Sequence, residues 1–168
     1  PSTVLRILND AGQGLAAGEV GEIGVKGPQV MAGYWLRPDE TARVMTADGF
    51  FRTGDLGLMD DNGNVHLIDR KKDVILVSGM NVYPNEVEDV IAAMPGVLEV
   101  AAVGIPDPRA GEAVKVVIVK KHPAISEDDV RAYSDANLSG YKRPTLVEFR
   151  SELPKSSVGK VLRRELRM

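Results

Sequence analysis

Lys160 has the sequence context that most strongly suggests chemistry. It follows Gly159 at the end of residues 153–160, and a glycine followed by a lysine also ends the phosphate-binding P-loop. Pro154 stands where that loop has its first glycine, and Val161 stands where a serine or threonine would bind magnesium. The segment is therefore not a P-loop. Taken alone, the Gly-Lys pair is more typical of a solvated lysine ahead of an amphipathic helix.

Two further polar residues adjoin predicted strands. Asp55 ends a Thr-Gly-Asp triplet after the aromatic run at residues 50–52, and such a triplet alone indicates a turn. Arg70 lies in the charged run of residues 69–73, where charge on an edge strand also discourages aggregation. A carboxylate accepts hydrogen bonds through two oxygens, and a guanidinium binds phosphate or carboxylate. Both residues are candidate ligand contacts, and both have a plain structural alternative.

Charge and composition narrow the class of protein. The net charge is −3, but residues 142–168 hold eight Lys and Arg against three Asp and Glu, a local +5 that leaves −8 for the remainder. This basic end fits either a solvated, arginine-rich helix or a local field for a phosphate-bearing ligand. The overall acidity and the few aromatic residues argue against nucleic acid as a partner.

Other ligands and compartments are disfavoured by what the sequence lacks. With no cysteine and two distant histidines, disulfides and Cys-ligated zinc are excluded and no metal site is expected in this chain. No apolar run approaches the roughly 20 residues that a membrane-spanning helix needs. No secretory signal opens the chain, so a cytoplasmic protein is expected.

The elements that position these residues divide the chain into two kinds of segment. Residues 1–69 read as short strands and turns, with one helical turn near residues 37–45 and an Asn-Gly hairpin joining residues 56–59 to 65–68. Such short strands have little to bury against. We therefore expect a β-rich piece of a larger unit.

Residues 70–168 alternate strands and helices. Residues 74–77 form an apolar strand, Ser78-Gly79 breaks it, and Pro84 opens a helix with an apolar stripe that Pro95-Gly96 ends. Strands are predicted at residues 97–103, 113–119 and 146–149, and Ser126 can cap a helix between the last two. The prediction is an α+β arrangement: a small α/β domain whose sheet of about three strands is covered by helices.

Three runs together resemble one known family. They are DRKKDVILVSGMNVYPNEVED at residues 69–89, the GYW and DGFFRTGD blocks at residues 33–35 and 48–55, and LPKSSVGKVLRREL at residues 153–166. They are similar to the adenylate-forming enzymes, which comprise acyl-CoA synthetases, luciferases and peptide-synthetase adenylation domains. The likeness is greatest for bacterial long-chain fatty acid CoA ligases. It implies that residues 1–70 end a large N-terminal domain and residues 71–168 form a mobile C-terminal lid, with a hinge at 70–73.

The resemblance also implies roles for the candidate residues in the nucleotide chemistry. Asp55 would accept hydrogen bonds from both ribose hydroxyls of the adenylate, and Arg70 would contact the ribose and the nearby phosphate. Lys72 would be the hinge residue, where many relatives carry aspartate. Lys160 would reach the carboxylate, the α-phosphate and the ribose during adenylate formation, as a flexible point charge can.

A second group of residues is implied in binding CoA. Ser78 and Gly79 would help line the pantetheine tunnel after the lid moves, where a glycine lets backbone approach ligand. Tyr141 and Arg143 would contact the CoA nucleotide by stacking and by phosphate binding. The sequence departs from some relatives at Ala110, where they carry a tryptophan, so adenine stacking is expected to be weaker or differently built.

The implied parent enzyme activates a fatty acid with ATP to an acyl-adenylate and then transfers the acyl group to CoA. The phosphate loop, the glutamate that helps to hold Mg²⁺ and most of the acyl pocket would lie upstream, as would any region that contacts a membrane. The chain is therefore expected to be an inactive C-terminal part that needs its own N-terminal domain. Two alternatives are an adenylation domain that loads a carrier protein and a non-catalytic module that binds CoA or AMP.

Overall fold

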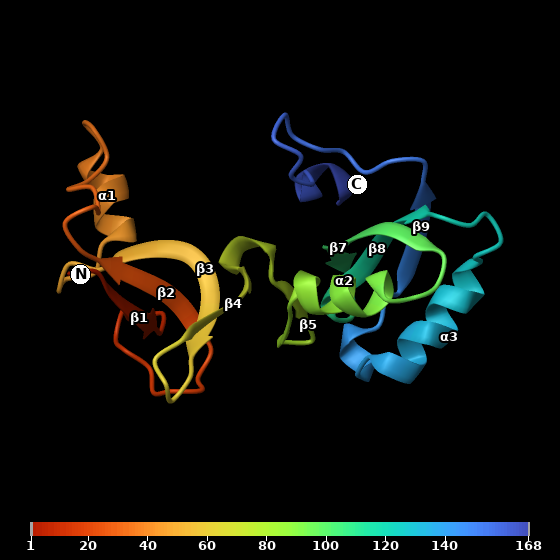
Figure 1. Ribbon diagram of the computed structural model, residues 1–168, viewed down its shortest axis with the longest axis horizontal. Helices are drawn as coiled ribbons and strands as arrows, with labels where there is room; N and C mark the ends of the chain where they lie inside the picture. The colour runs from red at the N-terminus through yellow and green to blue at the C-terminus, as the bar shows by residue number, and fades with distance from the viewer. Residues whose placement is uncertain (1, 168) are drawn as a thin grey trace. The chain divides into compact units, whose positions relative to one another are not determined.

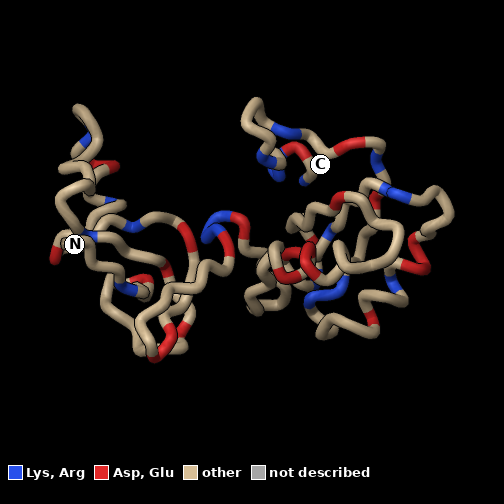
Figure 2. The backbone as a smooth tube through the Cα atoms, in the orientation of Figure 1, with Lys and Arg blue, Asp and Glu red and all other residues tan. Residues whose placement is uncertain are grey.

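The computed structural model describes residues 2–167 and divides into two compact units between Lys72 and Asp73 (Figure 1). Each unit has its own sheet, and we describe each by itself. Figure 2 shows basic residues gathered along the stretch that leads to the C-terminus of the second unit. The predicted boundary after residue 70 and the hinge at 70–73 stay predictions.

The first unit is a four-stranded antiparallel sheet in the order β1-β2-β3-β4. Its predicted hairpin is confirmed: Asp60 Oδ1 accepts hydrogen bonds from the backbone N–H groups of Asn62 at 2.9 Å and Asn64 at 2.8 Å, which closes the turn between β3 and β4. The predicted helical turn is also confirmed, as a helix that Pro38 opens. The elements are Val4–Leu8 (β1), Gly21–Lys26 (β2), Pro38–Val44 (α1), Phe51–Met59 (β3) and Val65–Arg70 (β4).

Few apolar side chains are buried in this first unit. They are Ile7, Leu8, Ile23 and Phe50. Trp35 and Leu36 remain 87% and 81% exposed in the segment between β2 and α1. This small core agrees with the expectation that the short strands have little to bury against.

The second unit is built on a five-stranded sheet in the order β6-β5-β8-β7, with β9 parallel to β8. The predicted α+β class is confirmed, but the predicted count of about three strands is wrong. The short strands β5 and β6 form a hairpin that joins the sheet where Val77 pairs with Gly111. The strands are Ile75–Val77 (β5), Met80–Val82 (β6), Val97–Asp107 (β7), Gly111–Lys120 (β8) and Leu146–Arg150 (β9).

Two helices cover one face of this sheet. Val87 and Ile91 of α2 (Pro84–Ala92) and Val130 of α3 (Glu127–Asn137) are fully buried in a core that includes Val116 and Ile118 of β8. The predicted cap is confirmed: the Ser126 side chain accepts a hydrogen bond from the backbone of Asp129, whose carboxylate accepts one from the backbone of Ser126.

The other face is covered by residues 151–167, which we call the C-terminal arm (dark blue in Figure 1). Leu153 and Leu166 of the arm are buried against Ala101, Val103, Val117 and Val119. The arginine-rich terminal helix, one of the two alternatives for the basic end, does not form: within the arm only Arg163–Leu166 makes a helical turn, the 3-10 turn η3. The arm uses two separated leucines to pack, and Pro154 and Gly159 between them do not favour a continuous helix.

A charged pair lies on the arm-covered face of the sheet. The side chain of Lys115 is only 3% exposed, and by strand alternation it shares a face with Val117. Its Nζ lies 2.7 Å from Glu148 Oε2 on β9, and Glu148 also accepts a hydrogen bond from Arg150. The hydrogen bond from Lys115, followed by that from Arg150, lowers the pKa of Glu148 below its ordinary value of 4.5.

We expect this pair to make the free energy of unfolding depend on pH in the acid range. Because the pKa of Glu148 is lowered in the folded state, its stabilising contribution is complete above pH 4.5 and is lost as the pH falls through the folded pKa. Glu148→Gln should lower the free energy of unfolding at pH 7 and flatten its dependence on pH in acid. Urea unfolding of both proteins between pH 7 and pH 3 checks this, and parallel profiles would contradict it.

Candidate functional site

The structure brings Asp55 and Arg70 together. They are direct partners in the β3–β4 ladder, and Arg70 Nε lies 3.2 Å from Asp55 Oδ1. Their side chains are 34% and 55% exposed, so the pair itself stabilises the fold little. A carboxylate acceptor and a guanidinium donor therefore stand side by side at the surface, where both can bind a ligand.

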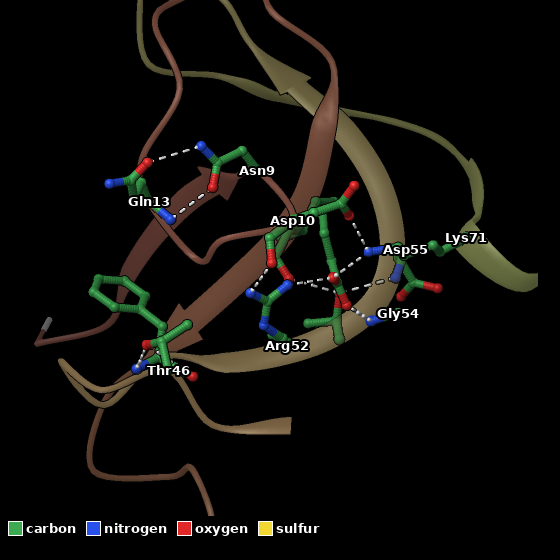
Figure 3. A network of polar contacts seen from close by, with 12 residues as sticks. Asn9, Asp10, Gln13, Thr46, Arg52, Gly54, Asp55 and Lys71 are labelled. Atoms are coloured by element: carbon green, nitrogen blue, oxygen red, sulfur yellow. Dashed lines mark hydrogen bonds and ion pairs between the residues drawn. The ribbon is translucent and has the colours of Figure 1, made fainter. Parts of the chain in front are cut away.

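Beside this pair, the buried carboxylate of Glu22 holds the backbone in place. It accepts hydrogen bonds from Arg52 at 3.0 Å, from the N–H of Gly54 at 3.1 Å and from Lys71 at 3.2 Å (Figure 3). Its side chain is only 7% exposed. Gly54 has φ +76°, a conformation that suits glycine, and Glu22 fixes it directly before Asp55.

Lys71 connects the predicted hinge to this buried cluster. Its Nζ also lies 2.8 Å from Asp10 Oδ1, and the hydrogen bonds to Asp10 and Glu22 raise the pKa of Lys71 despite its partial burial. Lys72 follows in the 3-10 turn η1 (Lys71–Asp73). A surface depression of about 460 Å³ is lined by Arg70, Lys71 and Lys72 together with Thr53 and Gly54.

A larger depression of about 910 Å³ also lies in the first unit, between α1 and the sheet. Arg6, Arg43, Asp48 and Tyr34 line it, and Asp55 and Arg70 do not. We place the candidate nucleotide contacts at the smaller depression, because the exposed carboxylate–guanidinium pair adjoins it.

Lys160 stands on a small turn of the second unit. Lys155 and Val161 pair as an antiparallel bridge, and the N–H of Ser156 donates to the carbonyl of Lys160 at 2.8 Å. Gly159 has φ +79° in this turn, and Lys160 is exposed. Residues 155–161, the Lys160 turn, are thus closed at their base and present the ammonium group to solvent.

Ser78 and Gly79 form a two-residue hairpin turn rather than the simple break that the sequence indicated. Val77 and Met80 on either side are partners in the ladder, and the two turn residues have φ of +52° and +79°. Positive φ at both positions is the geometry of a type I′ turn. The N–H of Ser78 donates to the carbonyl of Ala110 at 2.7 Å, which attaches the turn to the residue directly before β8.

Tyr141 and Arg143 lie near the end of α3. Tyr141 is half-buried against the core of the second unit. Arg143 donates to the carbonyls of Leu138 at 3.0 Å and Asp135 at 2.9 Å, so its guanidinium satisfies the C-terminal carbonyls of the helix. Its role in binding CoA stays a prediction, and it would be additional to this structural one.

Comparison with known proteins shows which family carries these features. Residues 86–160 match the AMP-binding enzyme C-terminal domain. The long-chain-fatty-acid–CoA ligase of Salmonella typhimurium is 56% identical over 167 residues, which are 99% of this chain and 30% of that protein. The chain belongs to the adenylate-forming enzymes. The structure of ATP-bound MatB from Rhodopseudomonas palustris matches this chain with a TM-score of 0.95 and 42% identity, over 99% of this chain and 34% of that one.

Other relatives have other names. The feruloyl-CoA synthase of Amycolatopsis sp is 44% identical over 166 residues, which are 98% of this chain and 34% of that protein. This chain therefore spans about a third of the length of the curated relatives described here. Within residues 2–167, no helix is long and apolar enough to cross a membrane. The same residues include no group of three or more acidic or histidine side chains arranged to hold a metal ion.

Sequence reasoning missed several residues that position the candidate contacts. Glu22 is one, although a glutamate among the apolar residues of a strand could have drawn attention to it. Lys71 is another, because in the sequence it is only one residue of a charged run. Arg163 is a third: it bonds with Glu88 and Asn85 of α2, which lie 75 and 78 residues away in sequence, and no local pattern indicates partners at that distance.

Removing the buried carboxylate of Glu22 should destabilise the first unit. Glu22→Ala leaves Arg52 without its acidic partner, and breaking a buried ion pair from one side typically costs about 3 kcal/mol. Urea unfolding measures the change. The matched control is Asp61→Ala at an exposed position, whose free energy of unfolding should stay within about 0.5 kcal/mol of that of the original protein. Equal effects of the two substitutions would contradict the role of Glu22.

A side chain at Gly79 should strain the hairpin without a clash. No atom lies within 4 Å of an added Cβ, but φ +79° costs an L-residue about 1–2 kcal/mol. Gly79→Ala should therefore lower the free energy of unfolding by about that amount. Gly140→Ala is the control, since it also has open space and no positive φ. Thermal unfolding that ranks the two variants in the opposite order would refute this expectation.

Proposed function

We propose that this chain is the C-terminal part of an AMP-forming acyl-CoA synthetase. The complete enzyme would join a fatty acid to ATP as an acyl-adenylate, release pyrophosphate, and then pass the acyl group to CoA. The observation that carries the proposal is the exposed pair of Asp55 and Arg70, held beside the buried Glu22 cluster in a chain of this family. Acceptors and a cation so arranged suit a ribose and its phosphate.

In this proposal, the first unit binds the nucleotide. Asp55 accepts hydrogen bonds from the ribose hydroxyls, and Arg70 turns from Asp55 toward ribose and phosphate. Because the pair is exposed and weak, ligand can replace it at small cost. ATP and Mg²⁺ are held mainly by residues upstream of this chain.

Lys160 supplies positive charge to the first half-reaction. Negative charge develops on phosphate oxygens as pyrophosphate leaves, and an ammonium group placed there stabilises the transition state. The Lys160 turn suits this task, because its base is closed by hydrogen bonds and its lysine is exposed.

The second half-reaction uses other residues of the same unit. The lid turns at Lys72, Lys160 withdraws, and the hairpin turn of Ser78 and Gly79 lines the path of pantetheine. Tyr141 and Arg143 contact the CoA nucleotide. A turn at a few residues is a common means of moving a domain.

A long-chain fatty acid is the proposed acyl substrate. The name of the Salmonella relative supports this substrate. A similar protein is named feruloyl-CoA synthase, a name that refers to an aromatic acid instead. The enzyme is proposed to work in the cytoplasm, with any peripheral membrane contact made by upstream residues. Without those residues the chain is expected to be inactive.

Measuring the two half-reactions separately tests this proposal. In the complete enzyme, Lys160→Ala should slow pyrophosphate release from ATP and fatty acid by about 100- to 1,000-fold, because a charge at the transition state is lost. Thioester formation from supplied acyl-adenylate and CoA should continue. Lys121→Ala, which removes another exposed lysine of the same unit, should change neither rate.

Two outcomes would overturn the proposed role. Unchanged pyrophosphate release would remove Lys160 from the first step. Equal loss of both half-reactions would give it a structural role. If the complete protein bound AMP and CoA but formed no adenylate, it would be a binding module, and the enzyme proposal would fail.

A further inference from the structure

Arg163 makes the most extensive polar contacts that the structure describes along the C-terminal arm. It lies three residues after Lys160, and its side chain is 20% exposed. One guanidinium nitrogen lies 2.8 Å from Glu88 Oε2 and 3.0 Å from Asn85 Oδ1, and Nε lies 3.2 Å from Glu88 Oε1. Both Glu88 oxygens are therefore engaged from the arm, in the fork geometry that arginine provides.

The same guanidinium also reaches the residue that follows the proposed hinge. Arg163 lies 3.7 Å from one carboxylate oxygen of Asp73, and Arg167 lies 3.7 Å from the other. The Asp73 side chain is 14% exposed, so these attractions are less screened than those at the surface. The arm is thus joined by charge both to α2 and to the first residue of the second unit.

Other contacts fix the arm on the opposite side of the Lys160 turn. Leu153 is buried, and Lys155 Nζ lies 2.7 Å from Glu99 Oε1 of β7. After the turn, the ion pair of Arg163 with Glu88 and the burial of Leu166 attach the arm to the rest of the second unit a second time. Lys160 itself is exposed between these two attachments.

We propose that Arg163 is a positioning residue for Lys160. By joining the arm to Asp73 and Glu88, it makes the Lys160 turn move as one body with the residue after Lys72. Rotation at the hinge then places the ammonium group, with little independent motion of the turn. This inference rests on the proposed function of Lys160 and adds a residue that acts only through it.

The test compares four variants of the complete enzyme in the two half-reactions. Arg163→Gln should slow pyrophosphate release by about 10- to 100-fold, since a displacement of about 1 Å can cost a reacting group that much. Thioester formation from supplied acyl-adenylate should stay within about threefold, because Lys160 takes no part in it. Arg163→Lys keeps the charge and loses the fork, so it should recover part of the rate.

Glu88→Gln tests the same contact from its partner, and Arg164→Gln is the matched control. Glu88→Gln keeps an oxygen for the N–H of Ala102, which donates to Glu88 at 2.8 Å, and should slow the same step. The Arg164 side chain is 84% exposed, and its substitution should change neither half-reaction. Thermal unfolding of each variant reports whether the protein is folded.

A double variant separates positioning from other roles. If Arg163 acts through Lys160, adding Arg163→Gln to Lys160→Ala should slow pyrophosphate release by less than twofold further. Multiplicative losses, equal losses in both half-reactions, or no loss with Arg163→Gln would each overturn the inference. If Lys160→Ala alone leaves pyrophosphate release unchanged, the proposed function of Lys160 fails instead.

Discussion

Ion pairs engage the side chains immediately before and after Lys72, and the proposed mechanism depends on this constraint. Before it, Lys71 bonds with Glu22 within the first unit. After it, Asp73 lies beside Arg163 within the second. Lys72 therefore lies between two anchored neighbours, and a rotation that a few residues absorb can be located there. The same two clusters also hold the backbone near Asp55 and the arm that carries Lys160.

Much of the fold could be predicted from local patterns. The hairpin between β3 and β4, the apolar stripe of α2 and the cap at Ser126 each follow from residues close in sequence, and each is confirmed. The second sheet has more strands than predicted for two reasons. The strand β6 is three residues long and too short to show alternation, and β5, although predicted as a strand, carries no local sign that it joins this sheet. The pairing of β5 with β8 is a long-range contact that no local pattern indicates.

The residues of the candidate site also fall into those that local sequence indicates and those that it does not. Asp55, Arg70 and Lys160 lie in short motifs, so residue types and resemblance were enough to select them, and the structure places the first two 3.2 Å apart. Glu22, Lys71 and Arg163 were missed, because what distinguishes them is burial and partners 30 to 78 residues away. The positioning residues of a site depend on the folded chain more than its contacting residues do.

The most direct measurement of the central claim is the effect of Lys72→Pro on the two half-reactions of the complete enzyme. Proline fixes φ near −65° and restricts the residue before it, so rotation at this position is limited. The account predicts that one half-reaction falls by at least about tenfold while the other continues. If both continue at the original rates, the chain does not turn at Lys72, and the account is contradicted.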